Sequence, residues 1–246
     1  MRKASYAPLG SQESFIVPLL AKEIARELRD IAFQIFNDNR SREVAALDCG
    51  CGNQPFRAAV LEQGFQYESL DVCQNSFNNV DYLCTLDCSN DQFRSVIERK
   101  YSLVLATEVL EHVSDWHAAF ANIASCVEPG GYVLLTAPFF YPLHEEPYDY
   151  CRPTVHQFEK VSRAAGLEVC LIKKLGNAVD VIGTILGAAN IRCSSGPGPI
   201  PAAANRVLLR LQKLAFTMLL RFRDRLESDC KTIYLSNIVV LRKPSP

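Results

Sequence analysis

Short apolar runs and amphipathic stretches alternate along most of this chain of 246 residues. The apolar runs are rich in residues that favour strands, and helical patterns separate most of them. The expected strands are Val44–Asp48, Tyr67–Asp71, Tyr82–Leu86, Leu103–Thr107, Tyr132–Thr136, Leu167–Ile172 and Ile233–Leu241, and the expected helices between them are Phe56–Gln63, Asp91–Lys100, Asp115–Val127 and Thr154–Ala165. Strands that alternate with helices pair in parallel through crossover connections. The pattern therefore predicts an α/β fold with a mostly parallel seven-strand sheet and helices on both faces.

Segments on either side of this alternation follow other patterns. Apolar residues at spacings of three and four predict a helix over Pro18–Phe36, preceded by a loose tail. After the sixth expected strand, Ala178–Ile191 is apolar and Cys193–Ala204 is a loop rich in Gly and Pro. Asn205 is placed to cap a helix that runs to about Leu226. We expect four parts: a tail and helix in 1–40, a core in 41–175, a helical insertion in 176–230, and the last strand and tail in 231–246.

Charge is unevenly distributed along the chain. The net charge is −1, which argues against a general nucleic-acid binder, and no nucleic-acid partner is expected. Residues 1–204 hold 17 Lys and Arg against 24 Asp and Glu, whereas residues 205–246 hold nine against three. The basic amphipathic helix expected within 205–228 indicates contact with an anionic membrane, with a second copy in a homodimer, or with the chain's own core. These alternatives stay open.

The location of the protein is expected to be cytoplasmic, with the inner membrane face as a site of peripheral contact. Met1 is not followed by the apolar run of a signal peptide, and the sequence has no stretch of 18 apolar residues. The ten cysteines are scattered through expected strands and helices, which favours reduced thiols over a disulfide framework.

The turn after the first expected strand, Asp48-Cys49-Gly50-Cys51-Gly52, is the most informative segment. Glycine allows left-handed backbone and close approach to a ligand, and the next helix adds unpaired N–H donors at the carboxyl edge of the sheet. The dinucleotide fingerprint requires a third glycine where this chain has Pro55, so NAD is disfavoured. A single Cys-x-Cys pair without matching partners is weak as a metal site, and no metal is predicted.

This turn resembles the first motif, D/E-x-G-x-G, of class I S-adenosylmethionine-dependent methyltransferases. Leu103–Val113 and Val127–Thr136 resemble later motifs of that family in the same order. The resemblance spans about residues 43–175 and implies a Rossmann-like methyltransferase fold, with S-adenosylmethionine as cofactor and S-adenosylhomocysteine as product. It implies that the turn lies against the methionine portion, that Asp71 binds the ribose hydroxyls, and that Asp87-Cys88 lies beside adenine. The implied cofactor-binding residues are Asp48, Gly50, Cys51, Gly52, Asp71, Val72, Asp87, Cys88, Thr107 and Glu108.

The segment Pro138–Thr154 follows the fifth expected strand and combines aromatic rings with His, carboxylates and Arg. Such a mixture can line an acceptor pocket at the carboxyl edge. The predicted acceptor-binding residues are Tyr141, Tyr148, Tyr150 and Arg152, and the predicted catalytic residues are His144, His112 and Asp149. The segment also resembles a subgroup of type 11 methyltransferases that is often encoded among bacterial polysaccharide or glycosylation functions. That resemblance implies a sugar or glycan-lipid acceptor.

Methyl transfer from a sulfonium is an in-line displacement, so the protein chiefly aligns the reacting groups. A hydroxyl acceptor must also lose a proton, and His144 and His112 are candidate bases because imidazole titrates near neutral pH. Asp149 is expected to orient a histidine or to bind a sugar hydroxyl. An amine acceptor needs less base catalysis. The alternatives are a non-catalytic domain that binds a partner through 178–228, and an NAD-dependent oxidoreductase.

Overall fold

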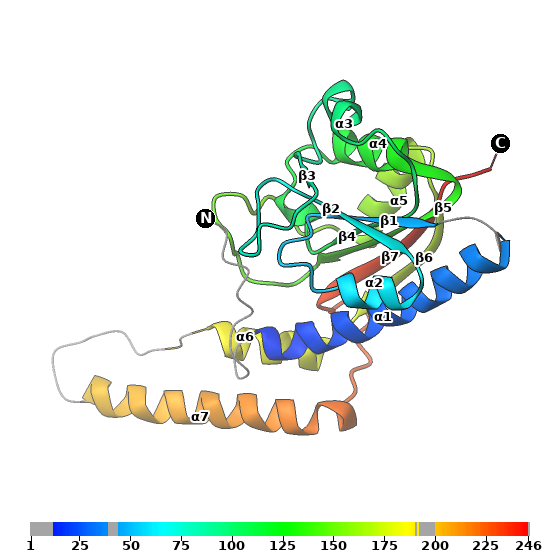
Figure 1. Ribbon diagram of the computed structural model, residues 1–246. Coiled ribbons are helices and arrows are strands. Elements are labelled where there is room, and N and C mark those ends of the chain that lie inside the picture. The colour runs from blue at the N-terminus through cyan, green and yellow to red at the C-terminus, as the bar shows by residue number, and fades with distance from the viewer. Residues whose placement is uncertain (1–11, 39–43, 190, 192–199, 246) are drawn as a thin grey trace.

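The computed structural model describes residues 12–38, 44–189, 191 and 200–245. Seven strands form one sheet in the order β3-β2-β1-β4-β5-β7-β6, and β7 runs antiparallel to both of its neighbours (Figure 1). The strands are β1 (Ala45–Cys49), β2 (Gln66–Asp71), β3 (Tyr82–Leu83), β4 (Tyr101–Thr107), β5 (Val127–Pro138), β6 (Glu168–Leu175) and β7 (Ser236–Arg242). The predicted fold class, a mostly parallel seven-strand sheet, is confirmed.

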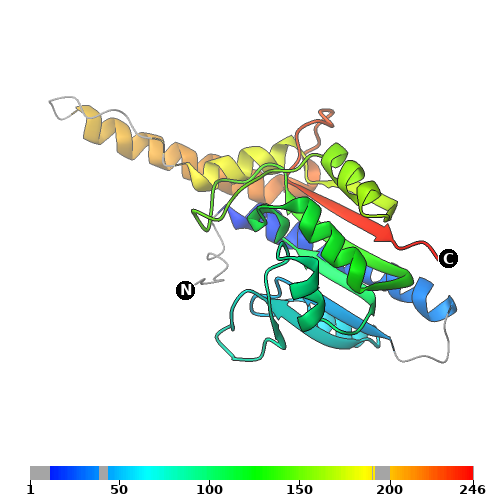
Figure 2. The same cartoon turned by 90° about the horizontal axis from the view of Figure 1, so that it is seen from above.

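Helices cover both faces of the sheet (Figures 1 and 2). One layer contains α1 (Glu13–Asp38), α2 (Arg57–Glu62) and α6 (Ala178–Ala188), and the other contains α3 (Asn90–Val96), α4 (Trp116–Cys126) and α5 (Val155–Ala164). Fully buried side chains such as Ile24 and Leu28 fill the first interface, and Phe93, Phe120 and Phe158 fill the second. Apolar burial on both faces explains why the strands have nearly continuous apolar sequences.

The first helix begins five residues before the predicted start at Pro18. A proline inside a helix removes one backbone hydrogen bond, which is why the sequence favoured a start there. Phe15 is fully buried, and its ring lies edge-on to Phe216 with 5.4 Å between the ring centroids. Burial of a large aromatic side chain offsets the lost hydrogen bond. The predicted tail, residues 1–10, lies outside the described residues.

The long helix near the carboxyl terminus also begins earlier than predicted. α7 spans Ile200–Phe222 and is followed by the short helix η2 (Arg223–Arg225), so Asn205 lies inside the helix and its predicted role as a cap is wrong. Proline is favoured in the first turn of a helix, and Pro201 occupies that turn. Much of the predicted loop Cys193–Ala204 lies outside the described residues.

One face of α7 packs against the core and the rest projects beyond the sheet (Figures 1 and 2). Phe216 is buried, and Gln212 donates hydrogen bonds to the carbonyl oxygens of Leu186 and Ala189. Directly after α7, in η2, Arg223 Nε lies 2.6 Å from Asp180 Oδ1. Of the three contacts predicted for the basic helix, the contact with the chain's own core is therefore present on this face. No helix that the structure describes is both long and apolar enough to cross a membrane.

The order of the strands changes direction between β1 and β4, and this change positions the site. The connection after β1 leads through α2 to β2, whereas α3 leads from β3 back to β4 on the other side of β1. The carboxyl ends of β1 and β4 are therefore neighbours from which the connections diverge. In open α/β sheets, ligands bind in the crevice at such a switch point.

Candidate active site

The glycine turn after β1 has the backbone that its sequence predicted. Gly50 and Gly52 have φ angles of +69° and +50°. A Cβ atom on Gly50 would lie 2.2 Å from Val109 Cγ2, so a larger residue does not fit there. A Cβ atom on Gly52 would meet no described atom within 4 Å, which leaves open space beside the turn. The N–H of Gly50 donates to the carbonyl oxygen of Leu70 at 2.7 Å and fixes the turn against β2.

Asp71 and Val72 lie on the β2 side of this open space. Asp71 Oδ2 accepts a hydrogen bond from the Gly52 N–H at 2.9 Å, and Oδ1 accepts one from the Val72 N–H at 2.6 Å. A carboxylate oxygen can accept two hydrogen bonds, so both oxygens can still receive a hydroxyl of a ribose diol. The Val72 side chain is 46% exposed and offers an apolar surface for a base. These groups fit a nucleoside cofactor such as S-adenosylmethionine.

Asp48 and the two cysteines of the turn, Cys49 and Cys51, are buried. Asp48 is 1% exposed, and the Tyr67 hydroxyl donates to its Oδ2 at 2.7 Å. Burial raises the pKa of Asp48 to about 7. Cys49 and Cys51 are buried, and burial raises the pKa of the Cys51 thiol to about 12. Because thiolates are the metal-binding form, this environment favours a packing role for both thiols.

Asp87 has a structural partner that the sequence did not indicate. Its Oδ2 accepts hydrogen bonds from the Ser114 hydroxyl at 2.7 Å and from the backbone N–H groups of Ser114 and Asp115 at 3.2 and 3.3 Å. Burial alone would raise the pKa of Asp87, but these hydrogen bonds hold it below its ordinary value. Cys88 Sγ lies 3.3 Å from Cys84 Sγ. Asp87 thus anchors the segment that leads into α4, and the adenine contact of Asp87 and Cys88 stays a prediction.

Thr107 ends β4 at the switch point, and Glu108 follows it. Glu108 has a φ angle of +51°, and its N–H donates to the carbonyl oxygen of Thr136 at 3.1 Å. The Ser236 hydroxyl donates to Glu108 Oε1 at 3.2 Å. Burial raises the pKa of Glu108 to about 7. The structure therefore holds this carboxyl group at the carboxyl edge, between β4 and the strands beside it.

The loop after β5 is fixed by an ion pair between Asp149 and Arg152. Arg152 Nη1 lies 2.5 Å from Asp149 Oδ1 and its Nη2 lies 2.7 Å from Oδ2, so the contact is bidentate. The same guanidinium donates to the carbonyl oxygens of Tyr141 and Pro142. Asp149 is partly desolvated, yet Arg152 lowers its pKa to about 2. Asp149 Oδ2 also lies 3.2 Å from His144 Nδ1, so the ion pair orients the imidazole.

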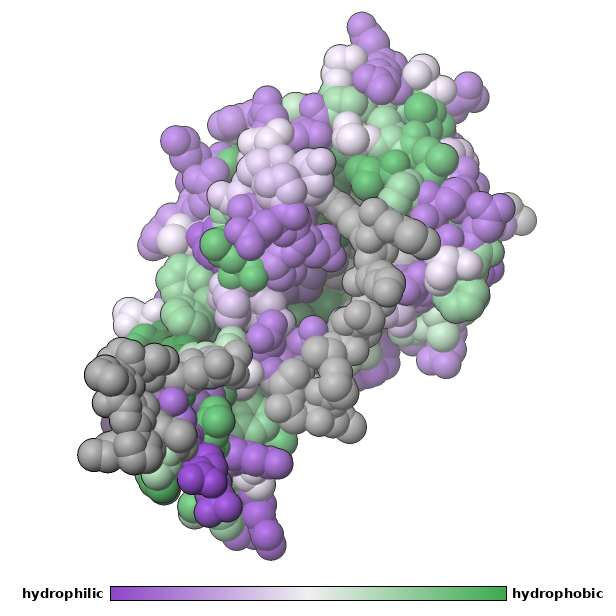
Figure 3. Space-filling model, turned by 90° about the vertical axis from the view of Figure 1, so that its left-hand side faces the viewer, coloured by the Kyte–Doolittle hydropathy of each residue, from purple (hydrophilic) through white to green (hydrophobic). Residues whose placement is uncertain are grey.

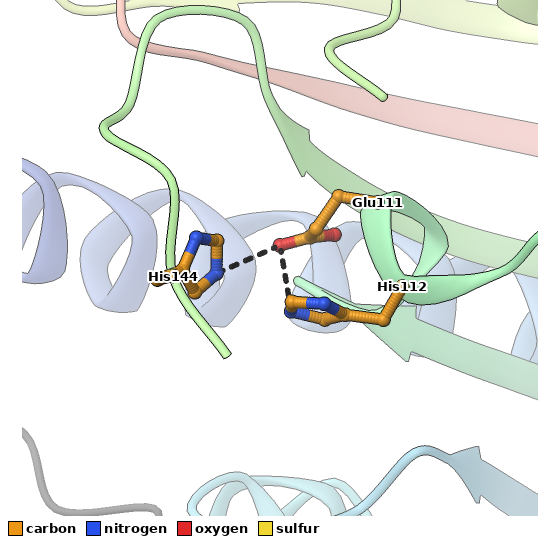
Figure 4. Close-up of side chains that lie close together, drawn as sticks. All are labelled: Glu111, His112 and His144. Atoms are coloured by element: carbon orange, nitrogen blue, oxygen red, sulfur yellow. Dashed lines mark ion pairs between the residues drawn. The ribbon is translucent and has the colours of Figure 1, made fainter. Parts of the chain in front are cut away.

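His112 and His144 come together although they are 32 positions apart in the sequence. His112 belongs to η1 (Leu110–His112) after β4, and the centroids of the two rings lie 4.8 Å apart in an edge-on contact. His112 Nδ1 lies 2.8 Å from the carbonyl oxygen of Tyr148. The Nε2 atoms of both rings lie 3.8 Å from Glu111 Oε1 (Figure 4).

Glu111 is the site residue that the sequence analysis missed. It is 1% exposed, and burial raises its pKa well above the ordinary value. Its Oε2 finds no hydrogen-bond partner among the described residues. Its position next to His112, directly after the fourth strand, was the available signal.

The three predicted tyrosines occupy different surroundings. The half-buried ring of Tyr141 lies edge-on to His144, with 5.2 Å between centroids. Tyr148 and Tyr150 are 54% and 52% exposed. The structure therefore brings Tyr141, Asp149 and Arg152 together around the histidines and leaves the other two rings at the surface.

Comparisons with known proteins agree with this geometry. Residues 20–170 match the sequence model of a methyltransferase domain family. Proteins named ubiquinone biosynthesis O-methyltransferase from Rickettsia bellii and Rickettsia typhi are 25% and 24% identical to the chain over 107 residues. These matches cover 41% of the chain, and 44% and 43% of the respective relatives, so the chain spans less than half the length of these curated relatives.

Solved structures share the fold. An S-adenosylmethionine-dependent methyltransferase from Archaeoglobus fulgidus superposes with a TM-score of 0.52 at 13% identity, covering 90% of this chain and 94% of that one. A protein from Galdieria sulphuraria, described as a sarcosine dimethylglycine methyltransferase, superposes with a TM-score of 0.53 at 14% identity, covering 89% and 86%. The family match covers more than half of the chain and includes the glycine turn, Asp71 and the Glu111–His112 pair. The chain belongs to the methyltransferase domain family, and its fold is that of S-adenosylmethionine-dependent methyltransferases.

Proposed function

We propose that the protein transfers the methyl group of S-adenosylmethionine to a hydroxyl oxygen of a sugar or glycan-lipid acceptor. The observation that carries this proposal is the position of Glu111, His112 and His144. They lie after β4 and β5, at the same carboxyl edge as the glycine turn after β1. A hydroxyl acceptor must lose its proton as it attacks, and polar groups at this edge can receive the acceptor.

The cofactor supplies a methyl group already activated on a sulfonium. The reaction forms a C–O bond and breaks the C–S bond, whose electron pair stays on sulfur, while the hydroxyl proton leaves. The chain's own contribution is to hold the acceptor in line and to remove that proton at the histidine cluster. The Asp149–Arg152 ion pair positions His144 for this purpose.

The acceptor class is supported by the surface around the cluster. Tyr148 and Tyr150 offer exposed rings beside polar groups, a combination that suits the apolar face and hydroxyls of a sugar. An acceptor from ubiquinone biosynthesis is the second candidate, and the names of the curated relatives support it. Both candidates accept the methyl group on oxygen.

A labelling assay tests the proposal. The protein is incubated with S-adenosylmethionine carrying a ¹³C-methyl group and with aqueous and lipid extracts of cells, and products are identified by mass spectrometry. We expect a labelled methyl ether in the lipid extract. We also expect turnover to fall by about 100-fold in His144→Ala, in keeping with loss of proton transfer, and to persist in His156→Ala, whose histidine is exposed on α5. Label on nitrogen or carbon, or no labelled product in either extract, would contradict O-methylation.

We further propose that α7 contacts an anionic membrane. A row of apolar side chains on α7 is 36 to 57% exposed, and basic side chains lie on one flank of this row. The apolar row consists of Val207, Leu211, Leu214, Met218 and Phe222, and the basic flank consists of Arg206, Arg210, Lys213 and Arg221. Figure 3 faces the end at which α7 projects and shows hydrophobic and strongly hydrophilic groups side by side there. Apolar insertion combined with attraction to anionic headgroups would place the enzyme next to a lipid-linked acceptor.

A further inference from the structure

The cluster of Glu111, His112 and His144 has the composition of a metal site. Glu111 and His112 project from η1 and His144 from the loop after β5, and the three side chains point toward one another (Figure 4). One potential ligand atom from each residue lies within 4.8 Å of the others. The sequence contains no recognisable ligand spacing, because the chain brings His144 to the other two residues only through the pairing of β4 with β5.

Both imidazoles direct the same nitrogen toward the carboxylate. His112 Nδ1 lies against the Tyr148 carbonyl oxygen, and His144 Nδ1 lies 3.3 Å from the Pro142 carbonyl oxygen as well as beside Asp149. These oxygens accept hydrogen bonds, and a neutral ring that donates to them from Nδ1 keeps its lone pair on Nε2. Arg152 Nη2 also lies 3.5 Å from His144 Nδ1. Metal-binding histidines in proteins are oriented by the same kind of contact to a carbonyl or a carboxylate.

The distances leave a gap rather than a hydrogen-bonded network. Glu111 Oε1 lies 3.8 Å from each Nε2 atom, which is beyond hydrogen-bond range. The donor atoms of a tetrahedral zinc site, each about 2.1 Å from the ion, are about 3.4 Å apart. The two Nε2–Oε1 distances exceed this separation by a few tenths of an ångström, and all three donor atoms lie within 4.8 Å of one another, so side-chain rotations bring them around one ion. Glu111 Oε2, buried and without a hydrogen-bond partner among the described residues, is a second and independent sign that a cation belongs beside this carboxylate.

The donor set selects the class of ion. Two imidazoles favour zinc, iron, cobalt and related first-row ions over magnesium and calcium, which prefer oxygen ligands. Three protein ligands leave at least one coordination position open, as in catalytic sites. We propose that Glu111, His112 and His144 bind one divalent first-row transition-metal ion, with Zn²⁺ as the ion that this donor set fits.

The consequence for chemistry rests on the proposed O-methylation. An ion in this position binds the acceptor hydroxyl at its open position and makes the hydroxyl more acidic, as it does a bound water. In the metal-bound form the hydroxyl proton passes to solvent water, and this route replaces the proton transfer to a histidine in the proposed function. In this form His112 and His144 act as metal ligands, and Asp149 acts as a positioning residue for His144.

Cobalt titration tests the metal site without reference to activity. Protein stripped with a chelator is titrated with Co²⁺, whose visible absorption reports imidazole coordination, and Zn²⁺ and Mg²⁺ are added as competitors. We expect one Co²⁺ per chain, displaced by Zn²⁺ and not by Mg²⁺. Glu111→Gln and His144→Asn should weaken binding by about 100-fold or more, because each removes a ligand. His117→Asn and His156→Asn, which alter the two exposed histidines, should bind Co²⁺ as the wild type does.

The outcomes separate this inference from the proposed function. Absence of Co²⁺ and Zn²⁺ binding in the wild type, or binding that survives both Glu111→Gln and His144→Asn, would overturn the metal site. Calorimetry with S-adenosylmethionine verifies that these variants remain folded. Full methyl transfer by protein stripped of metal would refute the role of the ion in deprotonation and leave O-methylation standing. Metal binding without transfer to any oxygen acceptor would support the metal site and refute O-methylation.

Discussion

At the scale of single residues, Asp48 couples the cofactor turn to pH. Its carboxyl group is 1% exposed, and burial raises its pKa from 3.8 to about 7. The folded state therefore holds a proton that the unfolded chain releases at lower pH. The contribution of this group to stability is fully present below about pH 4 and is lost as the pH rises through about 7.

We expect the free energy of unfolding to decline between about pH 4 and pH 7, and the decline to be smaller in Asp48→Asn. The pKa shift corresponds to an effect on the order of 4 kcal/mol. Asparagine keeps the acceptor for the Tyr67 hydroxyl and removes the titration. Urea unfolding at a series of pH values measures the effect. Asp91→Asn, on the exposed side of α3, should follow the wild type, whereas an equally steep decline in Asp48→Asn would refute the assignment.

Backbone conformations that depend on neighbouring residues were predictable from the sequence. Contacts between residues that the fold brings together were less predictable. Gly50 and Gly52 sit in a turn whose backbone is specified within a few positions, so their conformation followed from the sequence. The position of Glu111 beside His112 was visible in the sequence, but its contact with His144 depends on the pairing of β4 with β5. The hydrogen bonds from Ser114 to Asp87 also join distant segments, and no local pattern indicates them.

At the scale of elements, the loop between β5 and α5 depends on one side chain. Arg152 bridges both oxygens of Asp149 and two backbone carbonyl oxygens, and so ties the ends of the loop together. Asp149 in turn contacts the N–H and the ring of His144. The contacts of the whole loop therefore set the position of His144.

We expect Arg152→Met to lower methyl transfer by about tenfold or more and to leave the affinity for S-adenosylmethionine within about twofold, because the cofactor turn lies on other strands. The loop should also become more sensitive to proteolysis, since it loses a partly buried, bidentate ion pair. Kinetics, calorimetry and limited digestion measure the three effects. Arg163→Met, at the exposed end of α5, is the control. Loss of cofactor affinity comparable to the loss of rate would show that Arg152 does not act through the loop.

Element types followed from sequence periodicity, whereas several boundaries did not. The segment predicted as Tyr132–Thr136 extends to Val127–Pro138 because β5 pairs with β4 on one side and β7 on the other. The segment predicted as Tyr82–Leu86 shortens to Tyr82–Leu83 at the sheet edge, where only β2 is available as a partner. Tertiary pairing, which a local pattern does not contain, sets these ends.

At the scale of the whole molecule, the protein has an acidic part, residues 1–204, and a basic part, residues 205–246. The acidic part contains strands β1 to β6 and the site, and the basic residues of 205–246 include those on the projecting helix α7. The exposed row of α7 is the surface through which we propose membrane contact. Membrane contact and dimerisation both use apolar area, so the test must separate them.

We expect the protein to sediment with vesicles that contain phosphatidylglycerol and to remain in solution with phosphatidylcholine alone. The double variant Leu211→Glu and Leu214→Glu should weaken vesicle binding by more than about tenfold, because it removes two leucines from the apolar row and adds repulsion from the headgroups. Leu61→Glu, at an exposed leucine on α2, should bind normally. The result could instead be that the wild type does not bind anionic vesicles, forms a dimer, and loses the dimer in the double variant. That result would assign the apolar row to contact with a second copy of the chain.

The central claim, that the edge formed by the glycine turn and Asp71 binds S-adenosylmethionine, is tested most directly by calorimetry of cofactor binding to wild type, Asp71→Ala and Asp91→Ala. We predict one S-adenosylmethionine per chain for the wild type and for Asp91→Ala, whose carboxyl group is exposed on α3. Asp71→Ala should bind at least about tenfold more weakly, because the ribose hydroxyls lose their carboxylate acceptor. Absence of binding to the folded wild type, or equal affinity in Asp71→Ala, would contradict the account.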